Sequence, residues 1–226
     1  MLLLSMFGPK RREKNQPWEQ AKDLCASPIN SRDIPNFKKW VLYSGYKPEV
    51  DHLALDFATY IGRDGRCYIG LPSNTQVRAI RSGEVVGLTI PREIPYYHSI
   101  TILHDDVSSP VESLYAHTTP LPEILPGIKV KKGQVIGTLA HQTSYRGTEF
   151  ENLIHLHLEL KQSGKKINPL EILFPDNSWV PFEPFRDTAI INQPRFDEFA
   201  ARNPHEIHRE IKEARLAGKL QTIYEH

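Results

Sequence analysis

Apolar and polar residues alternate without a break from Ile154 to Leu160, the clearest pattern in the chain. Successive side chains of a β-strand point to opposite faces, so this alternation predicts a half-buried strand whose four apolar residues face a core. His155 and His157 then share the opposite face, one pleat apart. Two histidines in that arrangement can serve one site.

Short runs of β-type residues recur between turn signals through the middle of the chain. The predicted strands are 40–44, 52–59, 76–80, 84–89, 99–103, 113–117, 134–140 and 153–160. Because no helical pattern separates these runs, they favour an all-β, antiparallel domain with a sandwich or barrel-like core. We place this domain at residues 36–175.

The two ends of the chain differ from this domain. Residues 1–35 are polar and contain several prolines, so an irregular N-terminal arm is predicted. Residues 176–226 form a predicted extension, in which a Pro-rich wrap makes a sheet strand or a long helix unfavourable before 204. Apolar residues at helical spacing between Pro204 and Tyr224 then predict a terminal amphipathic helix. The extension could cover a groove as an autoinhibitory segment.

Two more segments add candidate chemistry. His52 and Asp56 lie on the polar face of an alternating run, but a straight strand would separate them by roughly 13 Å. The chain must therefore bend there if both bind one metal ion. His117 ends another predicted strand. A carboxylate and several imidazoles on strands of one β-domain can supply the three protein ligands of a zinc site together with general bases.

Composition narrows the function classes. The chain has 226 residues, of which 39% are hydrophobic, and a net charge of +1, so it lacks the basic footprint of a nucleic-acid-binding protein. Cys25 and Cys67 form no Cys-x-x-Cys pair, which argues against a cysteine metal cage or a disulfide framework. The apolar stretch at residues 1–7 is shorter than a signal core and its positive charges follow it, so we predict neither a secretory signal nor a membrane span.

Three separated motifs resemble the lysostaphin-type, LytM-like zinc endopeptidases, which cut peptidoglycan peptides. The motifs are His52-x-x-x-Asp56, Tyr115-Ala116-His117 and His155-Leu156-His157-Leu158-Glu159-Leu160, with similar connecting segments at 77–86, 130–137 and 168–170. The resemblance covers about residues 45–173. It implies the duplicated hybrid motif fold and a zinc-dependent hydrolysis of peptide bonds.

Carried over residue by residue, the resemblance implies that His52, Asp56 and His157 bind one Zn²⁺ ion and leave a fourth position for water. His117 and His155 are then the catalytic residues beside that water. The implied partner is a peptide of peptidoglycan, with no role for nucleic acid. Oligomeric state and the bond cleaved carry no sequence signal.

The chain departs from the family pattern at two places. Ala54 replaces the glycine that commonly separates the metal-binding histidine and aspartate, and alanine would be strained there only if the bend needs a positive φ. Thr118 replaces the leucine that follows Tyr-Ala-His, which we expect to change local packing only. Neither departure removes a predicted ligand or base.

The sequence also allows other functions. The chain could be a non-catalytic LytM-like module that binds cell wall or regulates another hydrolase. The metal could also be purely structural, with His155 as a fourth ligand beside the three above. A biotin- or lipoate-carrying hammerhead at 77–137 is disfavoured because Lys131-Lys132 does not sit in an attachment motif.

The remaining histidines and several tyrosines have more ordinary interpretations. His98, His104 and His141 are expected to be structural, at strand ends or in turns. Tyr96, Tyr97 and Tyr145 are expected to line a groove. For localisation, the resemblance implies work outside the cytoplasm, in the periplasm or cell wall, although no signal peptide is visible in the sequence.

Overall fold

The computed structural model describes residues 25–72, 74–90, 98–104, 110–140, 154–174, 179–191 and 222–224. Within these residues the fold is mostly β-strand, with antiparallel pairing throughout except for two short parallel pairs at sheet edges. One short α-helix accompanies the sheets. The all-β, antiparallel class predicted from the sequence is therefore confirmed.

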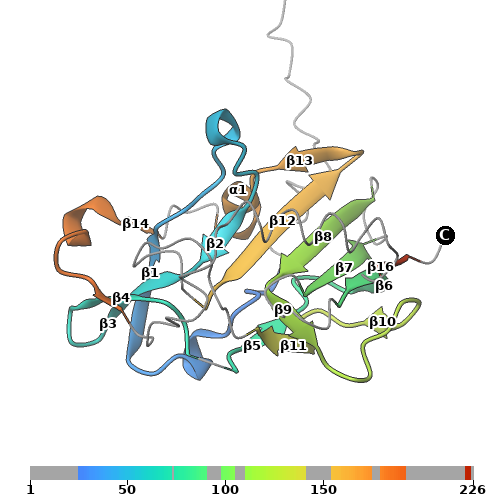
Figure 1. The fold of residues 1–226 in the computed structure, drawn as a ribbon, viewed down its shortest axis with the longest axis horizontal. Helices are drawn as coiled ribbons and strands as arrows, with labels where there is room; N and C mark the ends of the chain where they lie inside the picture. The colour runs from blue at the N-terminus through green and yellow to red at the C-terminus, as the bar shows by residue number, and fades with distance from the viewer. Residues whose placement is uncertain are drawn as a thin grey trace, which may run out of the picture.

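The largest sheet runs in the order β10-β6-β7-β8-β12-β13, while β2 also pairs with β12 and β16 with β6. Figure 1 shows β12 near the centre of the molecule, between β2 and β8. The bounds of these strands are Leu55–Phe57 for β2, Gly83–Thr89 for β6, Ser99–His104 for β7, Val111–Ala116 for β8, Lys129–Val130 for β10, Leu156–Gln162 for β12, Lys165–Ile167 for β13 and Thr222–Tyr224 for β16.

Two smaller sheets complete the described fold. The first has the order β14-β1-β3-β4-β15, and the second has the order β5-β11-β9. Their bounds are Phe37–Leu42 for β1, Thr59–Gly62 for β3, Cys67–Ile69 for β4, Gln76–Arg78 for β5, Thr118–Pro120 for β9, Val135–Leu139 for β11, Val180–Pro181 for β14 and Ile190–Ile191 for β15. Single turns of 3₁₀ helix lie at Ser31–Asp33, Pro48–Val50 and Glu183–Phe185.

The core lies against the inner face of β12. Ile154, Leu156, Leu158 and Leu160 are at most 2% exposed, whereas the residues between them are half-buried on the other face. This is the predicted alternation. The short helix α1, Pro169–Leu173, follows β13 and begins at Asn168, whose side-chain oxygen accepts a hydrogen bond from the Leu170 N–H.

The predicted strand 52–59 is wrong in its extent. The chain forms a bridge at His52, bends at Ala54, runs as β2 and is interrupted at Ala58 before β3. The break has a topological cause, since β2 pairs with β12 in the large sheet while β3 pairs with β1 in another sheet. A single straight strand could not serve both sheets.

The expectation that the Pro-rich wrap contains no sheet strand is also wrong. The strand β14 pairs with β1, and β15 pairs with β4, each in parallel. Both lie at the edges of their sheet, where the missing N–H of Pro181 interrupts no ladder. The extension therefore joins the sheet system of the domain.

Most of the predicted C-terminal helix lies outside the described residues. Its last three residues, Thr222–Tyr224, are not helical but form β16, which pairs antiparallel with β6. The types of these residues, threonine, isoleucine and tyrosine, favour a pleated strand. No helix in the described part of the chain has the length and apolarity of a membrane span.

Candidate metal centre

Strand β12 brings the candidate residues together because it has a partner on each side. In the ladder, His157 lies directly opposite Asp56 of β2 and directly opposite Ala116 of β8. Side chains of directly opposed residues project from the same face of a sheet. The side chain of Asp56 therefore lies next to that of His157. His117 directly follows Ala116 in the chain, so it lies close to both residues.

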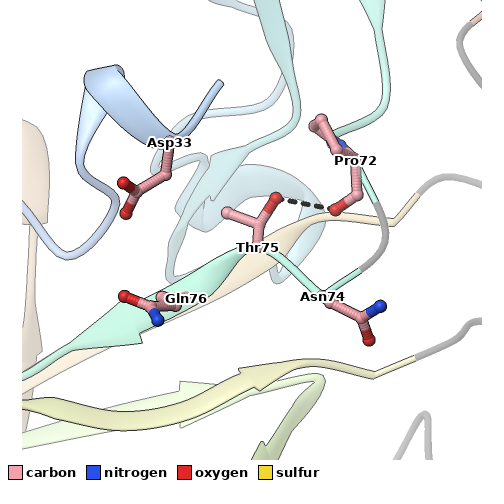
Figure 2. A pocket seen from close by; sticks show the side chains of 5 residues that line it. All are labelled: Asp33, Pro72, Asn74, Thr75 and Gln76. Carbon is pink, nitrogen blue, oxygen red and sulfur yellow. Dashed lines mark hydrogen bonds between the residues drawn. The ribbon is translucent and has the colours of Figure 1, made fainter. Parts of the chain in front are cut away.

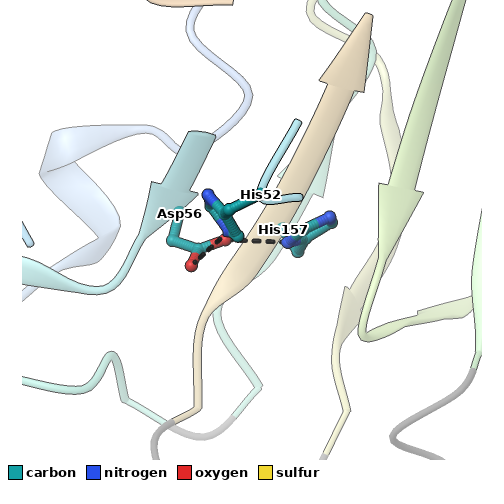
Figure 3. A group of neighbouring side chains, drawn as sticks. All are labelled: His52, Asp56 and His157. Carbon is teal, nitrogen blue, oxygen red and sulfur yellow. Dashed lines mark hydrogen bonds and ion pairs between the residues drawn. The ribbon is translucent and has the colours of Figure 1, made fainter. Parts of the chain in front are cut away.

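The bend before β2 brings His52 back to Asp56. Its Nε2 lies 3.1 Å from Oδ2 of Asp56, and Nδ1 of His157 lies 2.9 Å from Oδ1 of the same carboxylate. Figure 3 shows the three side chains converging from β2, from the segment before it and from β12. Their donor atoms all lie within 4.8 Å of one another, so they can hold one metal ion.

The hydrogen bonds of His52 fix its tautomer. Nδ1 lies 2.6 Å from the carbonyl oxygen of Gly45, which can only accept, so Nδ1 carries the proton and donates. Nε2 is buried and has no partner with hydrogen-bond geometry, although it lies 3.1 Å from Oδ2 of Asp56, within ion-pair distance. A buried nitrogen with a free lone pair, aimed at a carboxylate and a second imidazole, fits a divalent metal ion.

The electrostatics of the centre favour positive charge. Burial alone would lower the pKa of His157, but its hydrogen bonds to Asp56 and Glu159 and their charges raise it to about 9. The carboxylate of Asp56, 3.1 Å from Nε2, likewise raises the pKa of His52, against the effect of burial. Burial would raise the pKa of Asp56, yet the neighbouring imidazoles of His157 and His52 hold it well below its usual range. A field that stabilises protons on two imidazoles also attracts a cation.

His155 and His117 lie beside these three residues. Nε2 of His155 is 3.9 Å from Oδ1 of Asp56. The rings of His117 and His155 meet edge to face with centroids 4.7 Å apart, and His117 is 5.8 Å from the ring of His157. All five residues singled out in the sequence thus gather at one place.

His117 has an unusual backbone. Its φ is +59°, in the left-handed region that most residues avoid, and it forms the turn between β8 and β9. Its carbonyl accepts a hydrogen bond from the Ala140 N–H at 2.7 Å. The turn directs the imidazole toward the neighbouring histidines while the chain passes from one sheet to another.

The two departures from the family pattern are accommodated. Ala54 is fully buried at the bend and is not among the residues with positive φ, so alanine is not strained there. Thr118 is also fully buried, and its hydroxyl donates to the carbonyl of Ala116. Its hydroxyl is therefore satisfied locally.

Two of the other histidines, His98 and His104, make hydrogen bonds within the fold, as expected for structural residues. Nδ1 of His98 lies 2.9 Å from the hydroxyl of Thr119. His104 is fully buried between the carbonyl of Ser82 and the hydroxyl of Ser113, at 2.9 and 2.8 Å. His141, Tyr96, Tyr97 and Tyr145 lie outside the described residues.

The residues that support the ligands were not predicted from the sequence. The Gly45 carbonyl gives no sequence signal, because any residue carries one. Glu159 does give a signal, since the alternation in β12 places it on the same face as His155 and His157. Its carboxylate lies 3.4 Å from Nε2 of His157.

Two hollows are found in the described surface. One, of about 330 Å³, is lined by Asp33, Pro72, Asn74, Thr75 and Gln76. Figure 2 shows the Thr75 hydroxyl bonded to the Pro72 carbonyl, and the Asp33 carboxylate is paired with Arg78. None of the metal-centre residues lines this hollow.

The second hollow, of about 490 Å³, lies between the 42–47 loop, the start of α1 and residues 179–183. It is lined by aromatic residues of both segments, among them Tyr43, Tyr46, Trp179 and Phe182. Gly45, whose carbonyl accepts the hydrogen bond from His52, also lines it.

One comparison, with models of protein families, matches a segment that contains two of the three motifs. The model of peptidase family M23 matches residues 66–169, which include His117, His155 and His157. His52 and Asp56 precede the matched segment. A comparison with curated protein sequences found no match.

Several solved structures are similar to the chain. Csd3 from Helicobacter pylori is 19% identical with a TM-score of 0.42, over 66% of this chain and 33% of that one. Lysostaphin, the antimicrobial peptidase of Staphylococcus simulans, is 21% identical with a TM-score of 0.42, over 66% and 54%. A zinc-containing peptidase from Vibrio cholerae is 22% identical with a TM-score of 0.37, over 60% and 39%. The match thus spans about a third to about half of the length of these three proteins.

The family match covers two of the three motifs, those at β8 and β12, with His117 directly after β8, His155 directly before β12 and His157 within β12. Over residues 66–169 the chain is therefore similar to peptidase family M23.

Proposed function

We propose that the protein is a zinc-dependent endopeptidase that hydrolyses peptide cross-links or stem peptides of bacterial peptidoglycan. The observation that carries this proposal is the convergence of His52, Asp56 and His157 with His117 and His155 beside them. Three ligands with two further imidazoles match the needs of metal-assisted hydrolysis, which requires a metal site with an open position and a nearby base.

Zn²⁺ would be held by Nε2 of His52, the carboxylate of Asp56 and Nδ1 of His157, the atoms that face one another. When bound, zinc lowers the pKa of water and polarises a carbonyl group. Asp56 supplies the negative charge that offsets part of the metal's charge, and its low pKa keeps it ionised.

The two remaining imidazoles would have different roles, one in proton transfer and one in stabilising charge. His155 is the proposed base, because its Nε2 lies 3.9 Å from Oδ1 of Asp56, beside the proposed metal site. An imidazole takes the proton of the attacking water as the new C–O bond forms. The C–N bond then breaks, and the leaving amine takes a proton from an imidazole. His117, in contact with His155, would stabilise the charge that develops on the carbonyl oxygen.

Digestion of purified peptidoglycan and of short glycine or stem peptides tests the proposal directly. Products should carry new amino termini, and a chelator should abolish their formation while added Zn²⁺ restores it. Identification of these termini also gives the bond that is cleaved. A folded protein that binds zinc stoichiometrically and cleaves none of these substrates would instead be a non-catalytic module that binds or regulates.

A structural zinc cage with His155 as fourth ligand makes a different prediction. The donor of His155 is not within the group of atoms that lie inside 4.8 Å of one another, which favours three protein ligands. Replacing His155 by alanine should therefore leave zinc content unchanged and slow turnover. Loss of zinc from this variant would support the cage.

The proposed substrate lies outside the cytoplasm, so we propose an extracytoplasmic location, in the periplasm or cell wall. Fractionation of the native host with an antibody against the protein tests this. Recovery in the cytoplasmic fraction alone would contradict it.

A further inference from the structure

Glu159 lies on the same face of β12 as His155 and His157, and it is half-buried. Its Oε1 is 3.4 Å from Nε2 of His157, at the long end of hydrogen-bond distances. The ammonium group of Lys166, from the adjacent strand β13, donates to the same oxygen at 2.8 Å. Glu159 thus connects a candidate metal ligand to a cation on the next strand.

The two nitrogens of His157 face different groups. Nδ1 faces Asp56 at 2.9 Å and is the nitrogen available to a metal ion. When Nδ1 binds a metal, the proton of the neutral ring is on Nε2 and needs an acceptor. Metal-bound histidines commonly donate this N–H to a carboxylate, which fixes the ring and makes it a stronger ligand.

We propose that Glu159, held in place by Lys166, is a positioning residue that accepts the Nε2 proton of His157 and thereby strengthens metal binding. The inference rests on the metal site of the proposed function, but it does not depend on peptide hydrolysis. It assigns a role to a residue that touches neither the metal nor the substrate.

Lys166 serves Glu159 in two ways. The ammonium group of Lys166 lies 2.8 Å from Oε1 of Glu159 and so offsets the charge of this half-buried carboxylate. Lys166 also fixes the position of the carboxylate, and its own backbone carbonyl accepts a hydrogen bond from the Tyr46 hydroxyl at 3.2 Å. Tyr46 follows Gly45, whose carbonyl accepts the Nδ1 proton of His52. In each histidine, the nitrogen that points away from the metal site therefore has an acceptor: the Gly45 carbonyl for His52 and the Glu159 carboxylate for His157. The hydrogen bond between Tyr46 and Lys166 links the two segments that hold these acceptors.

The experiment measures zinc affinity of the full-length protein by competition with a chromogenic chelator, without substrate. The variants are Glu159→Ala, Glu159→Gln and Lys166→Met. The matched control is Glu112→Ala, which breaks the ion pair with Lys161 across β8 and β12 and leaves the metal centre untouched. Circular dichroism checks the fold of each variant.

Glu159→Ala should weaken zinc binding by about 10- to 100-fold, the usual effect of losing such an outer partner. Glu159→Gln should retain most of the wild-type zinc affinity, because its amide oxygen can accept the same hydrogen bond. The zinc affinity of Lys166→Met should lie between those of Glu159→Ala and Glu159→Gln. Glu112→Ala should stay within about twofold of the wild type, as expected for an exposed ion pair. Equal affinity for Glu159→Ala and the wild type would overturn the inference.

Nitrogen NMR of the histidine rings gives a second readout that needs no variant of Glu159. In the zinc-loaded wild type, His157 should carry its proton on Nε2, and a proton on Nδ1 would overturn the proposal even if Glu159→Ala fails to fold. The outcomes also separate the two proposals. A protein that shows the Glu159 effect and cleaves nothing contradicts the peptidase alone, whereas cleavage without any Glu159 effect contradicts this inference alone.

Discussion

Asp56 links the other two candidate metal ligands, since its Oδ2 faces His52 and its Oδ1 faces His157. Replacing it by asparagine keeps the size but removes the charge that raises the pKa of both His52 and His157. We expect Asp56→Asn to weaken zinc binding by more than about 100-fold, beyond the effect of an outer partner. Metal analysis after gel filtration and chelator competition measure the change.

The control for this variant is Asp33→Asn, which removes a carboxylate paired with Arg78 at 3.4 Å, remote from the ligands in the sequence. It should bind zinc as the wild type does. Retention of stoichiometric, tight zinc by Asp56→Asn would show that the three residues do not form the site.

His117 is expected to affect turnover and not metal content. Asparagine is the suitable replacement because it tolerates the positive φ of +59° that alanine would not. His117→Asn should retain zinc and lose about 10²- to 10³-fold in kcat, the range for removal of one group that stabilises the charge on the carbonyl oxygen. Peptide cleavage assays with parallel zinc analysis measure both quantities.

The matched histidine for this test is His98, which is bonded to Thr119 and assigned a structural role. His98→Gln should keep kcat near the wild-type value. If His117→Asn cleaves as fast as the wild type, His117 has no part in the reaction.

Among the elements at the candidate metal centre, β12 follows from the sequence more fully than β2 does. The period-2 alternation of β12 is local, so the face of His155 and His157 follows from the sequence alone. The pairing of His157 with Asp56 joins residues 101 positions apart, and local patterns do not specify such a register. The bend before β2 followed only from the requirement that His52 and Asp56 reach one ion.

Strand β9 begins directly after His117, so its position matters to the site. It lies against Gly137 of β11, where a Cβ would be 2.5 Å from the carbonyl oxygen of Thr119 and 2.6 Å from Cγ2 of Thr118. Gly137→Ala should therefore push β9 away and destabilise the fold by about 1–3 kcal/mol, the usual effect of overpacking. Urea unfolding followed by circular dichroism measures the loss.

Gly164 offers the contrast, because it has a φ of +79° and nothing within 4 Å of a built Cβ. Gly164→Asn should change the free energy of unfolding by less than about 1 kcal/mol, since asparagine tolerates this backbone region. Equal stability of Gly137→Ala and the wild type would mean that β9 and β11 can separate without penalty.

For the whole molecule, the boundary drawn at residue 175 separates parts that share one core. Trp179 is 8% exposed and stacks on Trp40 with ring centroids 5.5 Å apart, and it also meets Phe57 and Phe174 edge to face. The sequence could not show this, because two-residue strands such as β14 and β15 have no periodicity and the prolines indicated an irregular wrap. The described part of the extension, residues 179–191, is thus integral to the fold.

Trp179→Ala should destabilise the protein by about 3–5 kcal/mol, the usual effect of truncating a large buried aromatic residue. Glu183→Ala, an exposed change in the same segment, should stay within about 0.5 kcal/mol of the wild type. Chemical unfolding monitored by far-ultraviolet circular dichroism avoids the change in tryptophan fluorescence. Similar stability of both variants would show that the extension packs only loosely on the domain.

Zinc should stabilise the molecule as a whole, because its ligands come from segments far apart in the chain and come together only in the folded state. At free zinc one hundredfold above Kd, binding adds about 2.7 kcal/mol to the free energy of unfolding. For a domain of this size each kcal/mol raises Tm by roughly 2–4 °C, so we expect a rise of about 5–11 °C. Calorimetry with zinc and with a chelator measures it. Asp56→Asn should show no such rise, and the same zinc-dependent shift in that variant would place the ion elsewhere in the protein.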